Sequence, residues 1–229
     1  MKKHLLVGAI TGALLSSPLV QAAELDTLDQ KISYIMGLDV ATRMDGIGFN
    51  LDIDAFKQGL KELDGDRSLS DDIIQQAMQA AQERYQERQQ AMVLERAEAN
   101  QKLGAEFLAS NASKEGVVTT DSGLQYKVIS EGSGPMPAAT DTVRVHYRGT
   151  LVDGTEFDSS YKHGGPATFP LNGVIPGWTE GLQLIKQGSK AEFYIPAELA
   201  YGNHGMGQLI GPNATLIFEV ELLEINPAQ

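Results

Sequence analysis

The stretch TVRVHYRGTLVDGTEFDSS, residues 142–160, decides the fold of the C-terminal half of the chain. Apolar and polar side chains alternate over residues 143–151, and successive side chains of a β-strand point to opposite faces of a sheet. One face holds Val143, Val145 and Tyr147, and the other holds Arg144, His146 and Arg148. The Asp153-Gly154 pair that follows favours a tight hairpin turn. The stretch therefore predicts a hairpin in an antiparallel sheet with one face in a core and the other in water.

Further strands are predicted on both sides of this hairpin. Period-two patterns cover residues 124–130, 190–195 and 214–225. A helix signal runs over residues 177–185, where Trp178, Leu182 and Ile185 share one face. Residues 116–229 are therefore expected to form an antiparallel sheet that curves around one short helix.

The N-terminal half reads as helical from residue 24 to residue 112. Apolar residues at steps of three and four predict a first helix that ends before Asp45-Gly46. These apolar residues are Leu28, Ile32, Ile35, Met36, Val40 and Met44. A second helix is predicted near residues 54–63, and a third begins at Ser68 or Ser70 and runs to about Ser110. The third helix is polar on every side at residues 86–90, which is typical of a helix that bridges domains through solvent.

These patterns predict an α+β protein. Residues 23–68 are expected to form an all-α segment, residues 69–112 a long connecting helix and residues 116–229 the sheet domain. The apolar surface of the first two helices is larger than the start of the third helix can cover. This excess favours self-association of the N-terminal segment. A compact three-helix bundle within one chain is the alternative.

The first residues have the arrangement of a secretory signal peptide. Lys2 and Lys3 precede an apolar run over residues 5–15, and the small-residue site Val20-Gln21-Ala22 follows. The run is shorter than the roughly 20 apolar residues that span a bilayer, which disfavours a membrane anchor. Residues 1–22 are therefore predicted to be removed on export, with cleavage after Ala22 or, as an alternative, after Ala23.

Charge and cysteine content exclude several classes of protein. The chain carries 18 Lys and Arg against 30 Asp and Glu, and its formal net charge of -12 has the wrong sign for a nucleic-acid binder. Because there is no cysteine, disulfides, thiolate nucleophiles, Cys-ligated zinc and iron–sulfur clusters are excluded. His146, His163 and His204 are scattered rather than at ligand spacing, so neither a metal nor another cofactor is expected.

The C-terminal half also holds a series of short motifs. They are Val145-His146-Tyr147, DGTEFDSS at residues 153–160, VIPGW at residues 174–178, Ala200-Tyr201-Gly202 and PNATLIF at residues 212–218. In this order and spacing they resemble the FKBP-type peptidyl-prolyl cis-trans isomerases. Residues 31–34, the long helix and GLQYKVI at residues 123–129 are similar to the exported Mip-type branch (macrophage infectivity potentiator), in which helical N-terminal segments dimerise.

The resemblance implies the position and the residues of the site. It implies an apolar pocket lined by Tyr147, Phe157, Val174, Ile175, Trp178, Ile210 and Phe218, with Trp178 as the floor beneath the proline ring. Asp158 would orient neighbouring groups and interact with the rotating carbonyl, while Tyr201 and the backbone N–H of Ile175 would donate hydrogen bonds to the substrate. Asp158, Tyr201 and Phe157 are the candidate catalytic residues, and none of them needs to transfer a proton. Each residue alone has an ordinary packing or turn role as its alternative.

Three positions depart from the pattern of single-domain members. His163 stands where an Arg is usual, Ala167 replaces an aromatic residue after Pro166, and Met206 stands where an imidazole is common. These positions are expected at the rim of the pocket. We therefore expect them to alter substrate preference and macrolide affinity more than isomerisation itself.

The resemblance thus implies an exported, homodimeric prolyl isomerase of the periplasm, with the outer membrane or cell surface as an alternative location. Its expected partners are unfolded or partly folded exported proteins with X-Pro bonds, and the macrolides rapamycin and tacrolimus are expected inhibitors. The alternative is a dimeric chaperone that holds unfolded chains while isomerisation is incidental. An isomerase should act on a short proline peptide, whereas a holdase should act only on long chains.

Overall fold

The structure, a computed structural model, describes residues 25–63, 65 and 67–228 of the 229-residue chain. The predicted signal peptide lies outside the described residues. The chain divides into two compact units between Ser70 and Asp71. In the part of the chain that is described, no helix combines the length and the apolar character needed to cross a membrane.

The first unit contains the helices α1 (Leu28–Gly46) and α2 (Ile53–Lys61). A capping box starts α1: Thr27 Oγ1 accepts a hydrogen bond from Gln30 N, and Gln30 Oε1 accepts one from Thr27 N. The predicted end before Asp45-Gly46 was wrong by two residues. Gly48, which has a φ of 70°, provides the left-handed residue after the helix.

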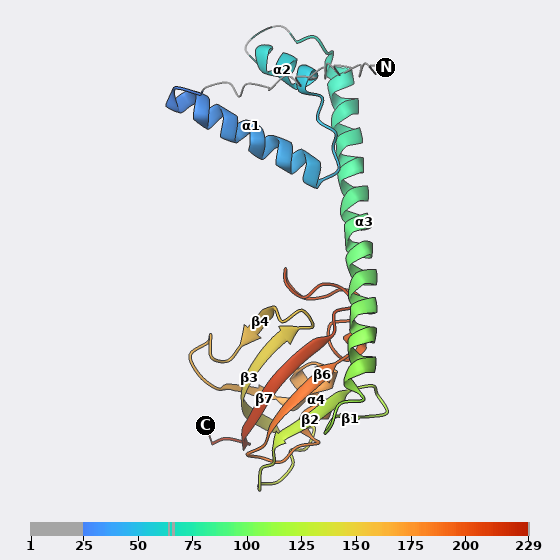
Figure 1. Ribbon diagram of the computed structural model, residues 1–229, viewed down its shortest axis with the longest axis vertical. Coiled ribbons are helices and arrows are strands. Elements are labelled where there is room, and N and C mark those ends of the chain that lie inside the picture. Colours follow the sequence, from blue (N-terminus) through green and yellow to red (C-terminus); the bar gives the residue numbers. More distant parts are fainter. Residues whose placement is uncertain (1–24, 64, 66, 229) are drawn as a thin grey trace, which may run out of the picture. The chain divides into compact units, whose positions relative to one another are not determined.

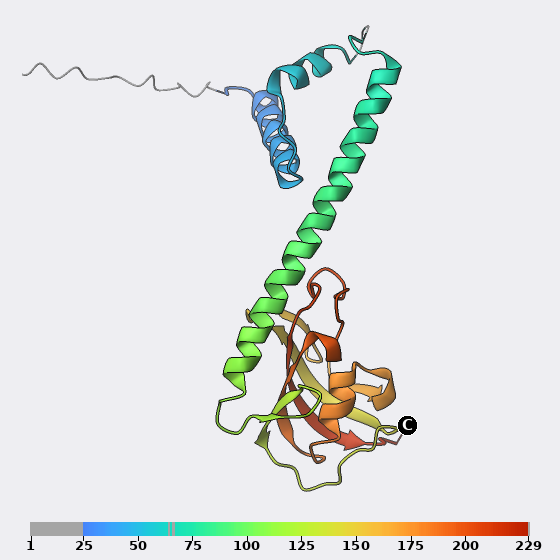
Figure 2. The same ribbon diagram turned by 90° about the vertical axis from the view of Figure 1, so that its right-hand side faces the viewer.

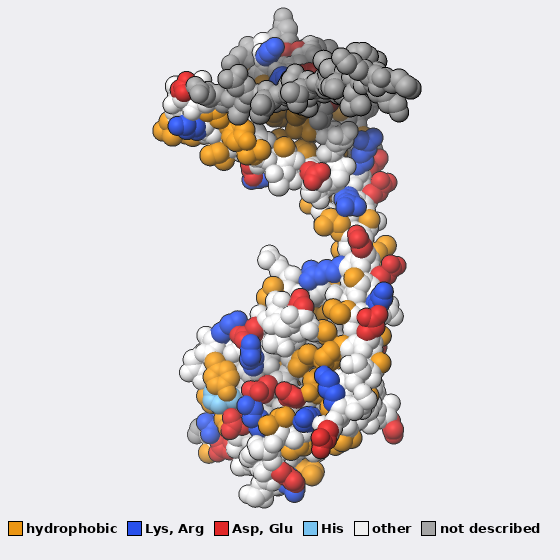
Figure 3. All heavy atoms as spheres, in the orientation of Figure 1, with side chains coloured by type: hydrophobic (Ala, Val, Ile, Leu, Met, Phe, Trp, Pro, Cys, Tyr) orange, Lys and Arg blue, Asp and Glu red, His pale blue; other side chains and the backbone are white. Residues whose placement is uncertain are grey.

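Apolar side chains of the first unit lie on its surface. Neither α1 nor α2 contains a buried residue. Figure 3 shows hydrophobic side chains gathered on α1, and the exposed ones include Leu28, Ile32, Tyr34, Ile35, Met36 and Leu38.

The second unit is built on a seven-stranded antiparallel sheet (Figure 1). Its strands are β1 (Val118–Thr119), β2 (Gln125–Ser130), β3 (Thr142–Leu151), β4 (Glu156–Ser159), β5 (Ala167–Pro170), β6 (Lys190–Ile195) and β7 (Leu216–Ile225). Their order is β1-β2-β6-β7-β3-β4, and β5 pairs with the first residues of β3. The strands predicted at residues 124–130, 143–151, 190–195 and 214–225 are confirmed as β2, β3, β6 and β7.

The hairpin predicted after β3 is also confirmed. Leu151 N donates to Thr155 O at 2.9 Å, and Gly154 takes a φ of 87° that other residues rarely adopt. The strands β1 and β5 were not predicted, because segments of two to four residues are too short to display a period of two.

One face of the sheet packs around helix α4 (Pro176–Leu182). The core there includes Val143, Val145, Trp178, Leu182, Phe193, Ile195, Leu216 and Val220. The predicted helix over residues 177–185 ends early, because Leu184 and Ile185 donate to the carbonyls of Gly181 and Leu182 in tighter three-residue turns. Ile185 is buried nonetheless.

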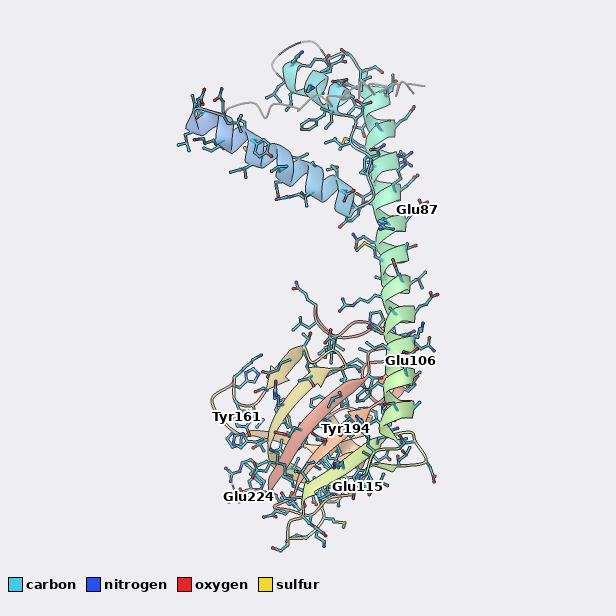
Figure 4. All side chains as sticks on the ribbon, viewed as in Figure 1. Glu87, Glu106, Glu115, Tyr161, Tyr194 and Glu224 are labelled. Atoms are coloured by element: carbon cyan, nitrogen blue, oxygen red, sulfur yellow. The ribbon has the colours of Figure 1, made fainter. Side chains whose placement is uncertain are left out.

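The C-terminal half of helix α3 (Asp71–Asn111) runs along one side of the sheet, as Figures 1 and 2 show. Tyr194 points away from the core residue Phe193, and its ring lies 5.9 Å from that of Phe107 on α3. Figure 4 shows Tyr194 on the sheet beside the lower part of α3. The fully buried Asn111 donates to Gln125 Oε1 at 2.9 Å, and Gln125 donates to Leu108 O. Helix α3 is therefore part of the compact unit that contains the sheet.

Candidate active site

A cavity of about 750 Å³ opens at one end of the sheet. Strands β3, β4, β5 and β7, helix α4 and the segment after Tyr201 all contribute to it. Its lining includes every site residue that the sequence predicted: Tyr147, Phe157, Asp158, Val174, Ile175, Trp178, Tyr201, Ile210 and Phe218. The volume falls in the range of about 300–1,000 Å³ that is typical of small-ligand sites.

The floor of the cavity is Trp178, which is 4% exposed. Three rings meet the indole nearly edge-on: Tyr147 at 5.3 Å, Phe218 at 5.1 Å and Phe169 at 5.8 Å. Such edge-to-face contacts are the preferred geometry of aromatic pairs and fix the ring planes. Among the described residues, Trp178 Nε1 has no hydrogen-bond partner. The floor is therefore aromatic and held rigidly from three sides.

The close approach of Phe157 and Phe218 depends on a glycine in β3. Gly149 pairs with both Asp158 and Phe218 across the sheet, and a Cβ at this position would lie 2.6 Å from the Phe157 ring and 2.8 Å from the Phe218 ring. The two rings pack at 5.4 Å over the space that the missing side chain leaves. A residue larger than glycine at position 149 would push one of these rings into the cavity.

Asp158 is the charged group in the wall of the cavity. Its Oδ2 accepts a hydrogen bond from the Tyr147 hydroxyl at 2.7 Å. Its Oδ1 accepts from its neighbour Ser159 N and lies 2.8 Å from His163 Nε2. The carboxylate is therefore fixed in orientation by a strand neighbour, a cross-strand tyrosine and the loop histidine.

These contacts keep Asp158 ionised. Burial raises the pKa of the carboxyl, but hydrogen bonds from Tyr147, His163 and Ser159 N–H outweigh burial and hold the pKa below its ordinary value. The pKa of the Tyr147 hydroxyl is raised, by burial first and then by the hydrogen bond to Asp158. Burial and the nearby Asp158 charge also raise the pKa of Tyr201. Both hydroxyls therefore remain protonated donors at neutral pH.

The three departures from the family pattern lie in different surroundings. His163 contacts Asp158 directly, and Met206 lines the cavity. Ala167 pairs with Val145 in the sheet and packs against the core. His163 and Met206 are thus adjacent to the groups that would meet a substrate.

Sequence reasoning missed part of the lining. Phe169, Gly207, Gln208 and Leu209 also line the cavity. Phe169 lies on β5, which is too short to display a period of two, and it joins the aromatic rings around Trp178 through the pairing of β5 with β3. Residues 207–209 carry no such signal either, because their placement depends on the turns at Gly205 and Gly207.

A curved antiparallel sheet around a short helix, with an aromatic cavity and one oriented carboxylate, defines the FKBP class of proteins. Residues 134–223 match the family described as FKBP-type peptidyl-prolyl cis-trans isomerase, and residues 29–128 match the domain amino terminal to it. The chain belongs to the FKBP-type peptidyl-prolyl cis-trans isomerases and is an enzyme of that class.

Relatives match over most of the chain. The isomerase FkpA of Aeromonas hydrophila is 46% identical over 211 residues, which cover 89% of this chain and 78% of that protein. The FKBP-type 22 kDa isomerase of Escherichia coli is 47% identical over 87% of this chain and 97% of its own. The outer membrane protein MIP of Legionella longbeachae is 40% identical over the whole of both chains.

The fold is matched as well. The crystal structure of FkpA from Escherichia coli has a TM-score of 0.75 and 42% identity, and the match covers 90% of this chain and all of that one. The predicted α+β fold with a helical N-terminal part and the resemblance to Mip-type isomerases are confirmed. These similarities support isomerisation and do not favour the holdase alternative over it.

Proposed function

We propose that the chain rotates X-Pro bonds in the cavity above Trp178, with Asp158, Tyr201 and Phe157 as the residues that act on the substrate. Rotation about such a bond meets a barrier of roughly 18–20 kcal/mol, because resonance gives the C–N bond partial double-bond character. The twisted amide loses this resonance, and its carbonyl is less polar than in the planar form. An apolar cavity therefore favours the twisted state over the planar one, which is how a site accelerates a reaction.

The rigid aromatic floor is the observation that carries the proposal. A proline ring on Trp178 would be enclosed by the rings of Tyr147, Phe169 and Phe218, which are already fixed by their mutual contacts. The Asp158 carboxylate and the Tyr201 hydroxyl would then lie beside the rotating bond. No covalent step is needed, so the absence of a nucleophile–base pair from the cavity lining fits this chemistry.

Substitution of the polar pair tests the assignment. Asp158→Ala and Tyr201→Phe should each lower kcat/KM on a short proline peptide by about tenfold or more, since each 1.36 kcal/mol of lost transition-state stabilisation costs a factor of ten. Phe157→Ala should lower it too, with some loss of stability because the ring packs on Phe218. Wild-type rates in all three folded variants would reject the site.

Matched controls come from the same domain. Tyr161 is 60% exposed and lies outside the cavity lining, so Tyr161→Phe removes a hydroxyl without touching the site. Asp121 lies in an exposed turn, and Asp121→Asn removes a carboxylate there. Both controls should keep the wild-type kcat/KM.

The wider setting of the enzyme is also proposed. We propose export to the periplasm after removal of residues 1–22, clients that are unfolded or partly folded exported proteins, and competitive binding of rapamycin or tacrolimus in the cavity. We also propose a homodimer formed through α1 and α2, whose exposed apolar side chains support an interface. The name of the Legionella longbeachae relative, an outer membrane protein, supports an envelope location.

A further inference from the structure

One wall of the cavity is a short segment that leaves the sheet between Tyr201 and Asn213. We call residues 203–212 the wall segment; Met206, Gly207, Gln208, Leu209 and Ile210 within it line the cavity. Met206 N donates to Ile210 O at 2.8 Å, which closes the segment on itself, and Asn213 N donates to Gly202 O at its base. Met206 and Leu209 are 57% and 48% exposed, so their side chains are available to a substrate.

Helix α3 holds this segment from outside the sheet domain. Arg96 Nη2 donates to Leu209 O at 2.8 Å, and Asn100 Nδ2 donates to Pro212 O at 2.8 Å. The two side chains are four residues apart and therefore project from the same face of the helix. They reach the two ends of one turn, Leu209 next to the cavity and Pro212 next to β7.

The contact is close because of a glycine. A Cβ at Gly211 would overlap Arg96 Nε and lie 2.8 Å from Asn100 Nδ2. Gly211 thus lets both side chains lie directly against the backbone of the segment. Further along the helix, Gly104 lies against Thr215 in the same manner, so that α3 follows the chain from the wall segment into β7.

We propose that Arg96 and Asn100 are positioning residues of the isomerase, which hold the wall segment over the cavity and thereby set how well it binds the residues that flank the substrate proline. This inference rests on the proposed site. Asp158, Tyr147 and Trp178 lie on β4, β3 and α4, whereas the hydrogen bonds of Arg96 and Asn100 go to Leu209 O and Pro212 O. Loss of either α3 side chain should therefore weaken substrate binding while the groups beside the rotating bond stay in place.

The test uses residues 23–229 with Arg96→Ala, Arg96→Lys and Asn100→Ala. NMR exchange measurements on a short proline peptide over a range of concentrations give kcat and KM separately. We expect KM of Arg96→Ala to rise about two- to tenfold, the effect of one ordinary hydrogen bond, with kcat within about twofold of wild type. Arg96→Lys should recover part of the loss, because an ammonium group can still donate to Leu209 O.

Arg88→Ala is the matched control, because Arg88 is an exposed arginine about two turns earlier in the same helix. It should keep the wild-type KM. The fluorescence of Trp178, the single tryptophan of the chain, should be unchanged in Arg96→Ala and would report any damage to the floor. If Arg96→Ala does not fold, Arg96→Lys and Asn100→Ala carry the test, and their KM should still rise.

Two results would overturn the inference. One is a KM of Arg96→Ala and Asn100→Ala equal to that of Arg88→Ala. The other is a fall in kcat at constant KM, which would mean that α3 acts on the reacting groups. A failure of the site itself is distinguishable, because Asp158→Ala and Tyr201→Phe would then have wild-type kinetics.

Discussion

Replacement of Gly104 by alanine tests whether α3 docks on the sheet domain as the structure describes. In an exposed helix interior this change would stabilise the fold by about 0.8–1.0 kcal/mol, the difference in helix propensity between the two residues. In α3 the new methyl group would overlap Thr215 Oγ1 and lie 3.2 Å from Thr215 Cβ. Thr215 is 6% exposed and cannot easily yield, so overpacking should cost about 1–3 kcal/mol. We expect a net destabilisation of about 0–2 kcal/mol, the difference between these two effects.

Because the net value is small, a double-mutant cycle with Thr215→Ala is the sharper assay. Removal of the hydroxyl and methyl groups of Thr215 relieves the overlap. The double variant should therefore be stabilised by the higher helix propensity of alanine at position 104. The coupling free energy between the two positions should then be about 1–3 kcal/mol in favour of the double variant, which is the relieved overpacking. Urea unfolding followed by Trp178 fluorescence gives the four stabilities, because this single tryptophan lies in the core of the second unit.

Additive effects would refute the docking. Positions without contact usually show coupling below about 0.3–0.5 kcal/mol. If Gly104→Ala stabilises the chain and its coupling free energy with Thr215→Ala is below about 0.5 kcal/mol, α3 does not lie against Thr215 in solution. The proposal for Arg96 and Asn100 would then lose its structural basis, because both side chains reach the wall segment from the same docked helix.

Other perturbations follow from the same contacts. A fragment of residues 116–229 keeps the cavity and should keep kcat on a peptide, but urea unfolding should show it about 4–9 kcal/mol less stable than residues 71–229. It loses the half-buried Phe107 and Leu108 and the four hydrogen bonds that join Arg96, Asn100, Leu108 and Asn111 to the sheet domain. Equal stability would contradict this. The pKa of Asp158 is lower in the folded chain than the unfolded value of 3.8, so the ionised carboxylate stabilises the fold above that pH. This stabilisation is lost as the pH falls from 3.8 through the folded pKa. The difference in the free energy of unfolding between wild type and Asp158→Asn should therefore shrink below pH 3.8. A constant difference across that range would mean that the carboxylate is not held by its neighbours. Analytical ultracentrifugation should find residues 23–229 dimeric and a chain that starts at Ser113 monomeric; a monomer in the first case would remove α1 and α2 as the interface.

The sequence predicted the core of the second unit because that core follows simple rules. Alternation over β3 set the faces of Val143, Val145 and Tyr147, and the Asp153-Gly154 turn set the register of the hairpin. The predicted site residues meet in one cavity because the sheet brings the strands, the helix and the loop that carry them together. What the alternation could not predict was β5, which has four residues and acquires its role through pairing with β3.

The role of α3 was hidden for a different physical reason. A helix face that docks through apolar side chains produces a stripe in the sequence, but only Phe107 and Leu108 near the end of α3 contribute such side chains. The other contacts use small and polar residues: Gly104 against a threonine, Asn111 against a glutamine, and Arg96 and Asn100 against backbone carbonyls. Hydrogen bonds to backbone carbonyls place no requirement on the residue type of the partner, so the wall segment carries no matching signal. The same residues look like those of a solvated spacer until the sheet domain is placed beside them. Because these contacts reach the cavity wall and the sheet, the compact unit that contains the cavity extends from the C-terminal domain into the helix that precedes it.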